Sequence, residues 1–298
     1  MRVLLLGPNG QLGTDVRRVH AAADTPVDLI PAGRRQLDVT DAQFEERLAE
    51  TPFDVLVNCT GYHRTDEAED NAKLAFAVNA QAVQRMARVC RRRRARFLHI
   101  STDYVFGGDT ERRSPLREDD PVAPVNVYGA SKALGETLAR LAWEDVLILR
   151  VASLFGVAGS SGKGGNFVET MLRLARERGE VRVVDDQAMS PTGTADVARV
   201  MLRMLTEGCD PGIYHVVNSG VATWYEFARE IVRQASVPAR ITPCTSAEFP
   251  TRASRPHYSA LDNAGVQARF GLLAPWQEAL TCHLDARRRL RSEGGPPV

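Results

Sequence analysis

The sequence has few of the features that mark secreted, metal-binding or membrane proteins. Its five cysteines are odd in number and never occur as C-x-x-C, a usage typical of reduced thiols in a cytoplasmic protein. Its six histidines show no ligand spacing, and we therefore predict no metal site. The apolar runs are too short to cross a membrane, and a strand pattern starts directly after Met1, where a signal peptide would lie. These absences favour a cytoplasmic protein without a membrane anchor.

Charge of one sign is also lacking. The 38 basic and 37 acidic side chains leave a net charge of +1, which gives no long-range field to attract nucleic acid or an anionic membrane. The basic run from Arg91 to Arg94 is interpreted as the solvated C-terminal turn of a helix, where cations offset the helix dipole. With 298 residues, 44% of them hydrophobic, the chain is long enough for one or two globular domains.

The beginning of the chain indicates a nucleotide-binding turn. Residues 3–6 read V-L-L-L, as expected of a parallel strand buried on both faces, and G-P-N-G-Q-L-G follows at residues 7–13. In such a turn Gly7 permits the tight bend, Gly10 lets backbone N–H groups approach a pyrophosphate, and Gly13 lets helix and strand pack closely. The N-terminus of the following helix then stabilises the phosphate charge. We therefore expect a dinucleotide cofactor.

The end of the second expected strand, residues 27–31, predicts which dinucleotide is bound. Sites that choose NAD place an acid there to bind the ribose 2′-hydroxyl, whereas this chain continues with A-G-R-R at residues 32–35. A guanidinium suits the 2′-phosphate of NADP, so NADPH is predicted, with NADH as the alternative. The other interpretation leaves Arg34 and Arg35 in solvent.

A helical pattern later in the chain provides two groups that could move a proton. Tyr128 and Lys132 are four residues apart, so both side chains lie on one helix face, one turn apart. An ammonium beside a phenol favours the phenolate, so we expect Lys132 to lower the pKa of Tyr128 from its ordinary value of about 10. Tyr128 would then pass a proton to or from a carbonyl oxygen. The alternative is a half-buried tyrosine beside a lysine whose stem covers apolar surface.

A hydroxyl group is expected beside this pair. The stretch at residues 97–100 predicts a strand that ends in Ser101 and Thr102, and ligands of doubly wound sheets bind at the carboxyl ends of the strands. Either hydroxyl could hydrogen-bond a substrate carbonyl; the alternative is a side chain that bonds to its own turn. Together with Tyr128 and Lys132, this pattern favours proton transfer at a carbonyl beside a bound dinucleotide.

The order of the expected elements predicts a doubly wound parallel α/β sheet, the Rossmann fold, with a smaller C-terminal α/β substrate domain. Strands and helices alternate through residues 1–152, which we assign to the NADP-binding domain, with a later return of the chain near residues 190–220. Residues 153–189 and 221–290 are assigned to the substrate domain, and residues 291–298 to a disordered tail. A second domain over a nucleotide site forms a cleft for a substrate.

Several motifs, in order, resemble those of one family. They are L-D-V-T-D at 37–41, S-T-D-Y-V-F at 101–106, Y-G-A-S-K-A-L-G-E at 128–136, T-W-Y-E-F-A at 223–228 and R-P at 255–256. From Arg2 to about Leu280 the chain resembles the extended short-chain dehydrogenase/reductases, and within them the dTDP-4-dehydrorhamnose reductases. The resemblance implies NADPH-dependent reduction of the C4 keto group of a nucleotide-linked 4-dehydro-6-deoxysugar, foremost dTDP-4-dehydro-L-rhamnose to dTDP-L-rhamnose.

The resemblance also implies residue roles. Tyr128 would protonate the C4 oxygen as hydride arrives, Lys132 would bind the nicotinamide ribose and tune Tyr128, and Thr102 would hydrogen-bond the keto oxygen. The cofactor would contact Gly7, Asn9, Gly10, Gln11, Leu12 and Gly13 at the pyrophosphate, Arg34, Asp38 and Val39 near the adenosine, and Thr60, Gly61, Tyr62 and Asn79 along its length. The sugar nucleotide would contact Thr102, Asp103, Tyr104, Asn166, Trp224 and Arg255.

Departures from the family pattern leave the sugar open. C-T-G at residues 59–61 replaces three alanines, H-R-T at 63–65 replaces T-x-V, and S-L-F at 153–155 stands where S-W-V-Y is usual. Asp15 occupies a position where some members bind Mg²⁺ through a glutamate at a dimer contact, and no matching glutamate follows Thr192, so no metal is predicted. The chain is expected to be a monomer or a homodimer.

Other interpretations of the same motifs stay open. The protein could reduce another dTDP-4-ketodeoxysugar. A dehydratase would need a glutamate where the chain has Tyr104, and an epimerase would retain NAD, contrary to the arginines after the second strand. A non-catalytic, NADP-binding regulatory subunit would resemble that of methionine adenosyltransferase. The complete set of Thr102, Tyr128 and Lys132 favours catalysis over that interpretation.

Overall fold

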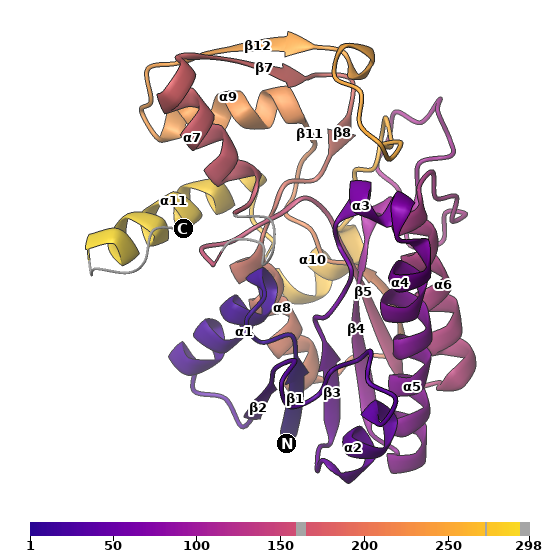
Figure 1. The fold of residues 1–298 in the computed structure, drawn as a ribbon. Coiled ribbons are helices and arrows are strands. Elements are labelled where there is room, and N and C mark those ends of the chain that lie inside the picture. Colours follow the sequence, from indigo (N-terminus) through magenta and orange to yellow (C-terminus); the bar gives the residue numbers. More distant parts are fainter. Residues whose placement is uncertain (159–164, 272, 293–298) are drawn as a thin grey trace.

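The computed structural model describes residues 1–158, 165–271 and 273–292, and a parallel sheet lies at its centre (Figure 1). Its strands are β1 (Arg2–Leu6), β2 (Asp28–Ala32), β3 (Val55–Asn58), β4 (Arg96–Thr102), β5 (Val146–Val151) and β10 (Gly212–His215). They lie in the order β10-β5-β4-β3-β1-β2, and neighbouring strands are parallel. The strand order therefore reverses beside β1, which creates the crevice where such sheets bind ligands. The predicted doubly wound fold is confirmed.

Helices cover both faces of this sheet. One face carries α1 (Gln11–Ala22), α8 (Thr194–Glu207) and α10 (Ala264–Phe270), and the other carries α2 (Phe44–Glu50), α5 (Ala82–Arg93) and α6 (Val127–Ala142). Val3 and Leu5 belong to the first core, whereas Leu4 and Leu6 belong to the second. Because successive strand residues point to opposite faces and both faces are buried, the strand reads as a continuous apolar run.

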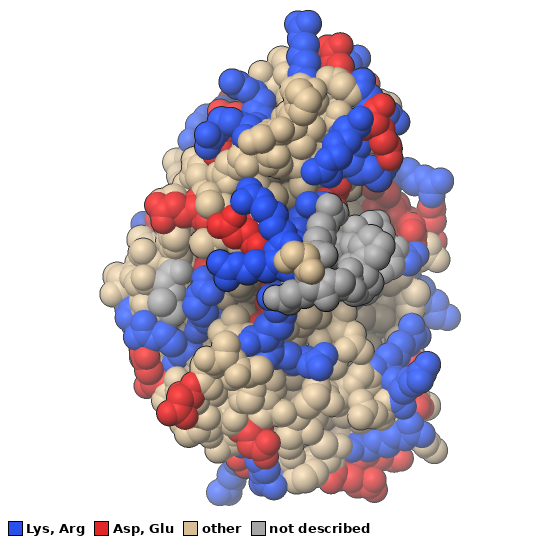
Figure 2. Space-filling view, turned by 90° about the vertical axis from the view of Figure 1, so that its left-hand side faces the viewer, with Lys and Arg blue, Asp and Glu red and all other residues tan. Residues whose placement is uncertain are grey.

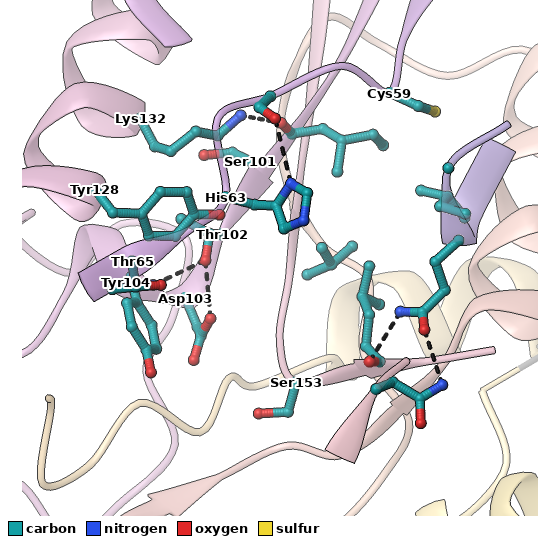
Figure 3. A pocket seen from close by; sticks show the side chains of 18 of the residues that line it. Cys59, His63, Thr65, Ser101, Thr102, Asp103, Tyr104, Tyr128, Lys132 and Ser153 are labelled. Atoms are coloured by element: carbon teal, nitrogen blue, oxygen red, sulfur yellow. Dashed lines mark hydrogen bonds between the residues drawn. The ribbon is translucent and has the colours of Figure 1, made fainter. Parts of the chain in front are cut away.

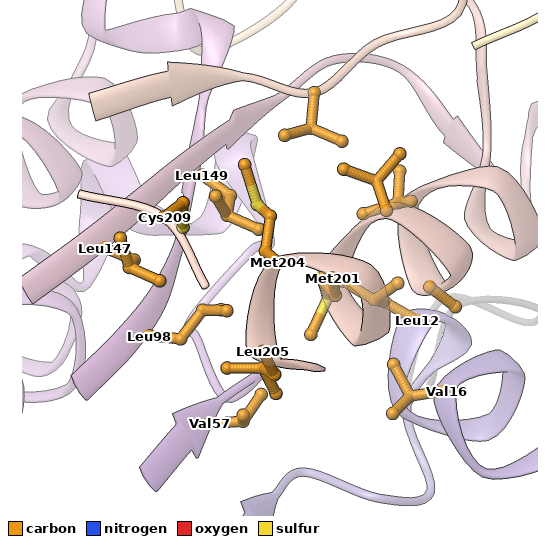
Figure 4. Close-up of a cluster of buried hydrophobic side chains, with 14 of the residues drawn as sticks. Leu12, Val16, Val57, Leu98, Leu147, Leu149, Met201, Met204, Leu205 and Cys209 are labelled. Atoms are coloured by element: carbon orange, nitrogen blue, oxygen red, sulfur yellow. The ribbon is translucent and has the colours of Figure 1, made fainter. Parts of the chain in front are cut away.

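The first of these cores positions the nucleotide-binding turn. Side chains of α1 and α8 meet side chains from the central strands in Figure 4. The labelled members are Leu12, Val16, Val57, Leu98, Leu147, Leu149, Met201, Met204, Leu205 and Cys209. This packing fixes α1 against β1, and so fixes the turn between them.

A smaller lobe lies at the top of Figure 1 and has its own apolar core. It contains α7 (Phe167–Arg178), α9 (Trp224–Gln234), α11 (Trp276–Ser292) and the parallel pair β7 (Glu180–Val184) and β12 (Arg240–Cys244). Short pairs link it to the rest: β8 (Ala188–Met189) with β11 (Ala222–Thr223), and β6 (Leu154–Phe155) with β9 (Thr192–Gly193). The remaining short helices are α3 (Thr65–Asp70), α4 (Ala72–Phe76), the π-helix η1 (Ala77–Gln81), and the 3₁₀ helices η2 (Asp103–Val105) and η3 (Ser246–Glu248).

The chain passes between the two lobes more than once. Helix α8 packs on α1 and β10 joins the edge of the sheet, while α10, from a later segment, contributes Val266 and Phe270 to the core beneath the sheet. Helix α11 continues to Ser292, so the segment predicted as a disordered tail begins inside a helix, and residues 293–298 lie outside the described part of the chain. The division into two domains stays a proposal. Residues 264–270, assigned above to the substrate domain, pack against the sheet instead.

Charges of both signs cover the side of the molecule shown in Figure 2. A group of basic side chains lies near the middle of that side, over the region of α1 and α11. Several arginines of these helices have acidic partners, as in Arg18 with Asp15 at 3.3 Å and Arg288 with Asp285 at 2.8 Å. Within the described residues, no helix is long and apolar enough to cross a membrane.

Candidate active site

A cavity of about 790 Å³ lies at the carboxyl ends of the central strands, at the point where the strand order reverses. Its walls come from the glycine turn after β1, the segment after β3, the end of β4, helix α6 and the start of α7 and α9. A second cavity of about 350 Å³ shares Gly7, Arg34, Thr60, Gly61 and His63 with it and extends along the end of β2. The two cavities together form an elongated depression, as a dinucleotide and a substrate laid end to end would need.

The glycine turn is shaped for a phosphate. Gly7 has a φ of +75°, and a Cβ on Gly13 would lie 2.1 Å from the carbonyl oxygen of Gly7, so both positions require glycine. Helix α1 starts beside the cavity, and no described side chain caps it. Its first N–H groups are therefore available to an anion. This arrangement fits the pyrophosphate of a dinucleotide.

Of the other residues predicted to contact the pyrophosphate, three line the large cavity and one does not. Gly10, Gln11 and Leu12 line the large cavity, whereas Asn9 is exposed and lies outside the described lining of both cavities. The Gln11 amide donates to the carbonyl oxygen of Leu154 at 3.0 Å and accepts from Asn166 at 2.9 Å. Gln11 therefore connects the nucleotide-binding turn with the smaller lobe.

The predicted 2′-phosphate ligand has an acidic partner in the structure. Arg34 lines both cavities and its side chain is 81% exposed, yet its Nε donates to Asp38 at 2.8 Å. Asp38 also accepts from the backbone N–H and the hydroxyl of Thr40. Although desolvation acts in the opposite direction, the bonds from Arg34 and Thr40 lower the pKa of Asp38. Asp38 and Val39, the two residues predicted to meet the adenine, line the smaller cavity.

Thr60, Gly61 and Tyr62 follow β3 and line the smaller cavity, and the first two also line the large one. Asn79 lies outside the described lining of both cavities, and its side chain is hydrogen-bonded to the backbone of the segment at residues 60–62. Its amide accepts from the Tyr62 N–H at 2.8 Å, donates to the Tyr62 carbonyl at 3.0 Å and donates to Ser131 at 2.9 Å. Asn79 belongs to the π-helix η1, a local widening that often occurs at functional sites.

Thr102, Tyr128 and Lys132 come together at the large cavity (Figure 3). The Thr102 hydroxyl donates to Asp103 at 3.0 Å and accepts from the backbone N–H of Tyr104 at 3.2 Å. Asp103 also accepts from Ser259 at 2.6 Å, and burial raises the pKa of Asp103 to about 6. The Thr102 side chain also lies close enough to Tyr128 to oppose the rise in the pKa of Tyr128 that burial causes. The two hydroxyl groups thus lie side by side where a carbonyl oxygen could be bound.

The protonation of Tyr128 differs from the sequence prediction. Burial raises the pKa of Tyr128 to about 12, although the Thr102 side chain acts in the opposite direction. Lys132 does not produce the predicted lowering, because its Nζ donates to the carbonyl oxygen of Ile100 at 2.5 Å and lies 3.2 Å from Nε2 of His99. Burial lowers the pKa of Lys132 itself to about 8. Tyr128 is therefore a protonated group that can donate to a substrate.

The residues predicted to meet the sugar nucleotide mostly line the same cavity. Asp103, Tyr104, Asn166 and Trp224 do so along with Thr102. The ring of Tyr104 packs edge-on against that of Tyr128, with centroids 5.9 Å apart. The amide of Asn166 caps α7 by accepting from the Glu169 N–H at 3.1 Å. Trp224 packs against Phe167, with ring centroids 4.6 Å apart, and forms an aromatic wall of the smaller lobe.

Arg255 is placed differently from the prediction. It lies outside the described lining of the large cavity, and its guanidinium donates to Asp66 of α3 at 2.7 Å. The guanidinium also lies over the ring of Tyr104, 6.0 Å from the centroid. Arg255 therefore connects the smaller lobe to α3 behind the substrate wall.

Sequence reasoning missed two kinds of site residue. Phe167 and Thr170 line the large cavity without having been predicted there, whereas His63, Thr65 and Ser153, which also line it, were noted in the sequence as departures from the family pattern. Asn58 and His99 are fully buried and lie behind Lys132. The sequence did contain a signal for the buried pair of Asn58 and His99. His99 interrupts the apolar stretch F-L-H-I at residues 97–100, and a buried polar side chain needs a specific partner.

The parallel sheet, the glycine turn and the Tyr128–Lys132 pair define an extended short-chain dehydrogenase/reductase. Residues 1–289 match the family model described as the RmlD substrate binding domain, and the chain belongs to this family. A dTDP-4-dehydrorhamnose reductase of Mycobacterium tuberculosis is 38% identical over 291 residues, covering 96% of this chain and 93% of the relative. A probable dTDP-4,6-dihydroxy-2-methyloxan-3-one 4-ketoreductase of Streptomyces antibioticus is 38% identical over 287 residues, covering 94% and 93%. The solved structure of a dTDP-4-dehydrorhamnose reductase from Bacillus anthracis, in complex with NADP, has a TM-score of 0.85 at 34% identity and covers 96% of this chain and 99% of its own.

Proposed function

We propose that the protein reduces the C4 keto group of dTDP-4-dehydro-L-rhamnose to give dTDP-L-rhamnose, with NADPH as the reductant. The observation that carries this proposal is the position of Thr102, Tyr128 and Lys132 in one cavity, between a phosphate-binding turn and the aromatic wall of the smaller lobe. Membership of the family and the names of its relatives support the same reaction.

Each group at the cavity has a separate role in the reaction. NADPH supplies the hydride. Tyr128 donates its hydroxyl proton to the C4 oxygen as charge develops there, because its pKa of about 12 keeps it protonated until that moment. Thr102 donates to the same oxygen once its hydroxyl hydrogen turns from Asp103 to the substrate, while the Tyr104 N–H still donates to the Thr102 oxygen. Lys132 binds the ribose next to the nicotinamide.

The identity of the sugar depends on the residues that line the substrate end of the cavity. His63, Thr65 and Ser153 line the cavity at positions where the chain departs from the family pattern. One relative is named for reduction of a different dTDP-linked ketosugar. A reductase of another dTDP-4-ketodeoxysugar is therefore the second candidate function.

The assay that tests the proposal follows the loss of NADPH absorbance with dTDP-4-dehydro-L-rhamnose and, in parallel, with a second dTDP-4-ketodeoxysugar. We expect turnover with the first at a higher kcat/KM than with the second. A higher kcat/KM for the second would replace the rhamnose assignment with the other ketosugar. Tight NADPH binding without oxidation by either sugar would favour a non-catalytic, nucleotide-binding subunit.

The preference for NADPH is expected to depend on Arg34. Replacing Arg34 with Ala should raise the KM for NADPH about tenfold and leave that for NADH nearly unchanged, because a charge-assisted bond to a phosphate contributes on the order of 1.5–3 kcal/mol and exposure reduces it. The measurement is the KM for each cofactor at saturating sugar. Arg35→Ala is the matched control, since Arg35 lies outside the described lining of both cavities. Equal losses for NADPH and NADH would contradict the assignment.

We also propose that the enzyme works in the cytoplasm as a monomer or a homodimer, with a sugar nucleotide as its partner. The five cysteines are free thiols, which suits a reducing compartment. No nucleic acid or membrane partner is proposed, because the net charge is +1.

A further inference from the structure

A buried polar group lies behind Lys132, away from the cavity. Asn58 ends β3 and His99 lies in β4, and the two are paired across the parallel ladder. Paired residues of neighbouring strands present their side chains to the same face. Both side chains are fully buried, and Lys132 of α6 covers them. Because all three are buried, these polar side chains need hydrogen-bond partners among themselves and in the adjacent backbone.

The orientation of the Asn58 amide is fixed by its neighbour. Its Oδ1 accepts from the backbone N–H of Thr60 at 2.9 Å and from the Thr60 hydroxyl at 2.6 Å. A backbone N–H can only donate, so the oxygen of the amide has to face Thr60. The Nδ2 group then faces Nδ1 of His99 at 3.0 Å and donates to it. Nδ1 of His99 must accept, which places the hydrogen of the neutral ring on Nε2.

The ring hydrogen of His99 consequently points at Lys132. Nε2 lies 3.2 Å from Nζ of Lys132, which also donates to the Ile100 carbonyl at 2.5 Å. Burial lowers the pKa of His99 well below its usual value, so the ring stays neutral. A neutral Lys132 amine accepts from Nε2 and still donates to Ile100, and each group then has a partner. An ammonium would place an N–H against an N–H inside a buried site, which is costly.

We propose that Asn58 and His99 are positioning residues for Lys132: Asn58 fixes the tautomer of His99, and His99 fixes the direction and the protonation preference of the Lys132 nitrogen. The inference rests on the proposed function, in which Lys132 binds the ribose beside Tyr128. A nitrogen held in this way keeps its remaining donor for the cofactor and can exchange a proton near neutral pH.

Several other groups face Lys132 and act on its charge. Glu136, on the same helix, favours the ammonium, but it is paired with Arg150 of β5 at 2.8 Å. Cys59, after β3, also favours the ammonium, whereas burial opposes it. Tyr128 lies one turn away on α6 and is neutral. Burial is the largest influence on the pKa of Lys132 and lowers it in spite of Glu136 and Cys59.

The decisive variant is Asn58→Asp, which keeps the shape of the side chain and reverses its hydrogen bonding. A carboxylate accepts from both Thr60 and His99, so the ring hydrogen moves to Nδ1 and the bare Nε2 accepts from a Lys132 ammonium. We expect the pKa of Lys132 to rise by about one unit or more, a tenfold change in its protonation equilibrium. Side-chain NMR of protein labelled with ¹³C,¹⁵N-lysine measures it, because Lys73, Lys132 and Lys163 are the only lysines in the sequence. Lys73→Arg and Lys163→Arg assign the signals.

The double variant Asn58→Asp with His99→Phe separates the tautomer from the new charge. Without the imidazole, only the carboxylate acts on Lys132, so the upward shift should shrink by at least half. A shift of the same size in the double variant would overturn the proposal, as would a change of less than about 0.3 unit in Asn58→Asp. In the parent protein, ¹⁵N shifts of His99 should report a hydrogen on Nε2, and a hydrogen on Nδ1 would also overturn it.

The NMR measurements on Lys132 and His99 need no sugar substrate, so their outcome does not depend on whether the proposed reaction is correct. In a parent that reduces the ketosugar, the acidic limb of the pH profile of kcat/KM, on which activity falls as Lys132 gains a proton, should move with the pKa of Lys132 in Asn58→Asp. A parent with the expected His99 tautomer and Lys132 titration but no turnover would disprove the reaction and leave the positioning pair intact. An acidic limb that stays fixed while the pKa of Lys132 moves would overturn the role of the pair in catalysis.

Discussion

Replacing Tyr128 with Phe should lower kcat for ketosugar reduction by about 10²-fold or more. Tyr128 lines the cavity together with Thr102, and a positioned proton donor contributes on the order of 10²–10⁴-fold. The aromatic ring would remain and would keep its edge contact with Tyr104. NADPH binding, measured by fluorescence titration, should therefore change little while kcat collapses.

The matched control is Tyr214→Phe in β10. The Tyr214 hydroxyl donates to the Asp210 carbonyl at 2.7 Å, and the residue lies outside the described lining of both cavities. Its kcat should equal that of the parent. A Tyr128→Phe enzyme that retained more than about a tenth of the parent kcat would show that another group supplies the proton.

The second large effect concerns stability. Glu136→Gln should lower the free energy of unfolding by about 3–5 kcal/mol, because it leaves a buried guanidinium without its counter-charge. The side chains of Arg150 and Glu136 are 2% and 5% exposed, and they form a two-bond pair at 3.0 and 2.8 Å. Ser101, at the end of β4, also donates to Glu136. The pair therefore joins α6, which carries Tyr128 and Lys132, to the two strands beneath it. Urea unfolding measures the change.

An exposed ion pair provides the comparison for Glu136→Gln. Arg173 and Glu177 form a bridge at 2.9 Å with side chains 59% and 52% exposed, so Glu177→Gln should change stability by less than about 0.5 kcal/mol. A double replacement, Glu136→Gln with Arg150→Met, should recover most of the loss by removing the unpaired charge. A loss below about 1 kcal/mol for Glu136→Gln alone would mean that water reaches Arg150 in solution.

The sequence alone was sufficient for the features that depend on local spacing. The apolar run at residues 3–6 indicated a strand with both faces buried, and those four side chains do divide between the two cores. The spacing of Gly7 and Gly13 indicated a close turn, because a side chain at either position would be blocked or strained. The four-residue spacing of Tyr128 and Lys132 placed both on one face of α6.

Only the tertiary structure decided how these groups behave. Arg255 is paired with Asp66, a residue 189 positions away in the sequence, and Arg34 is paired with Asp38 through the shape of a loop. Lys132 is turned toward His99 and Ile100, and burial raises the pKa of Tyr128 rather than lowering it. Spacing along the chain fixes which side chains share a face. Desolvation and the choice of hydrogen-bond partner depend on everything that packs around them, and those determine the direction and the charge of each group.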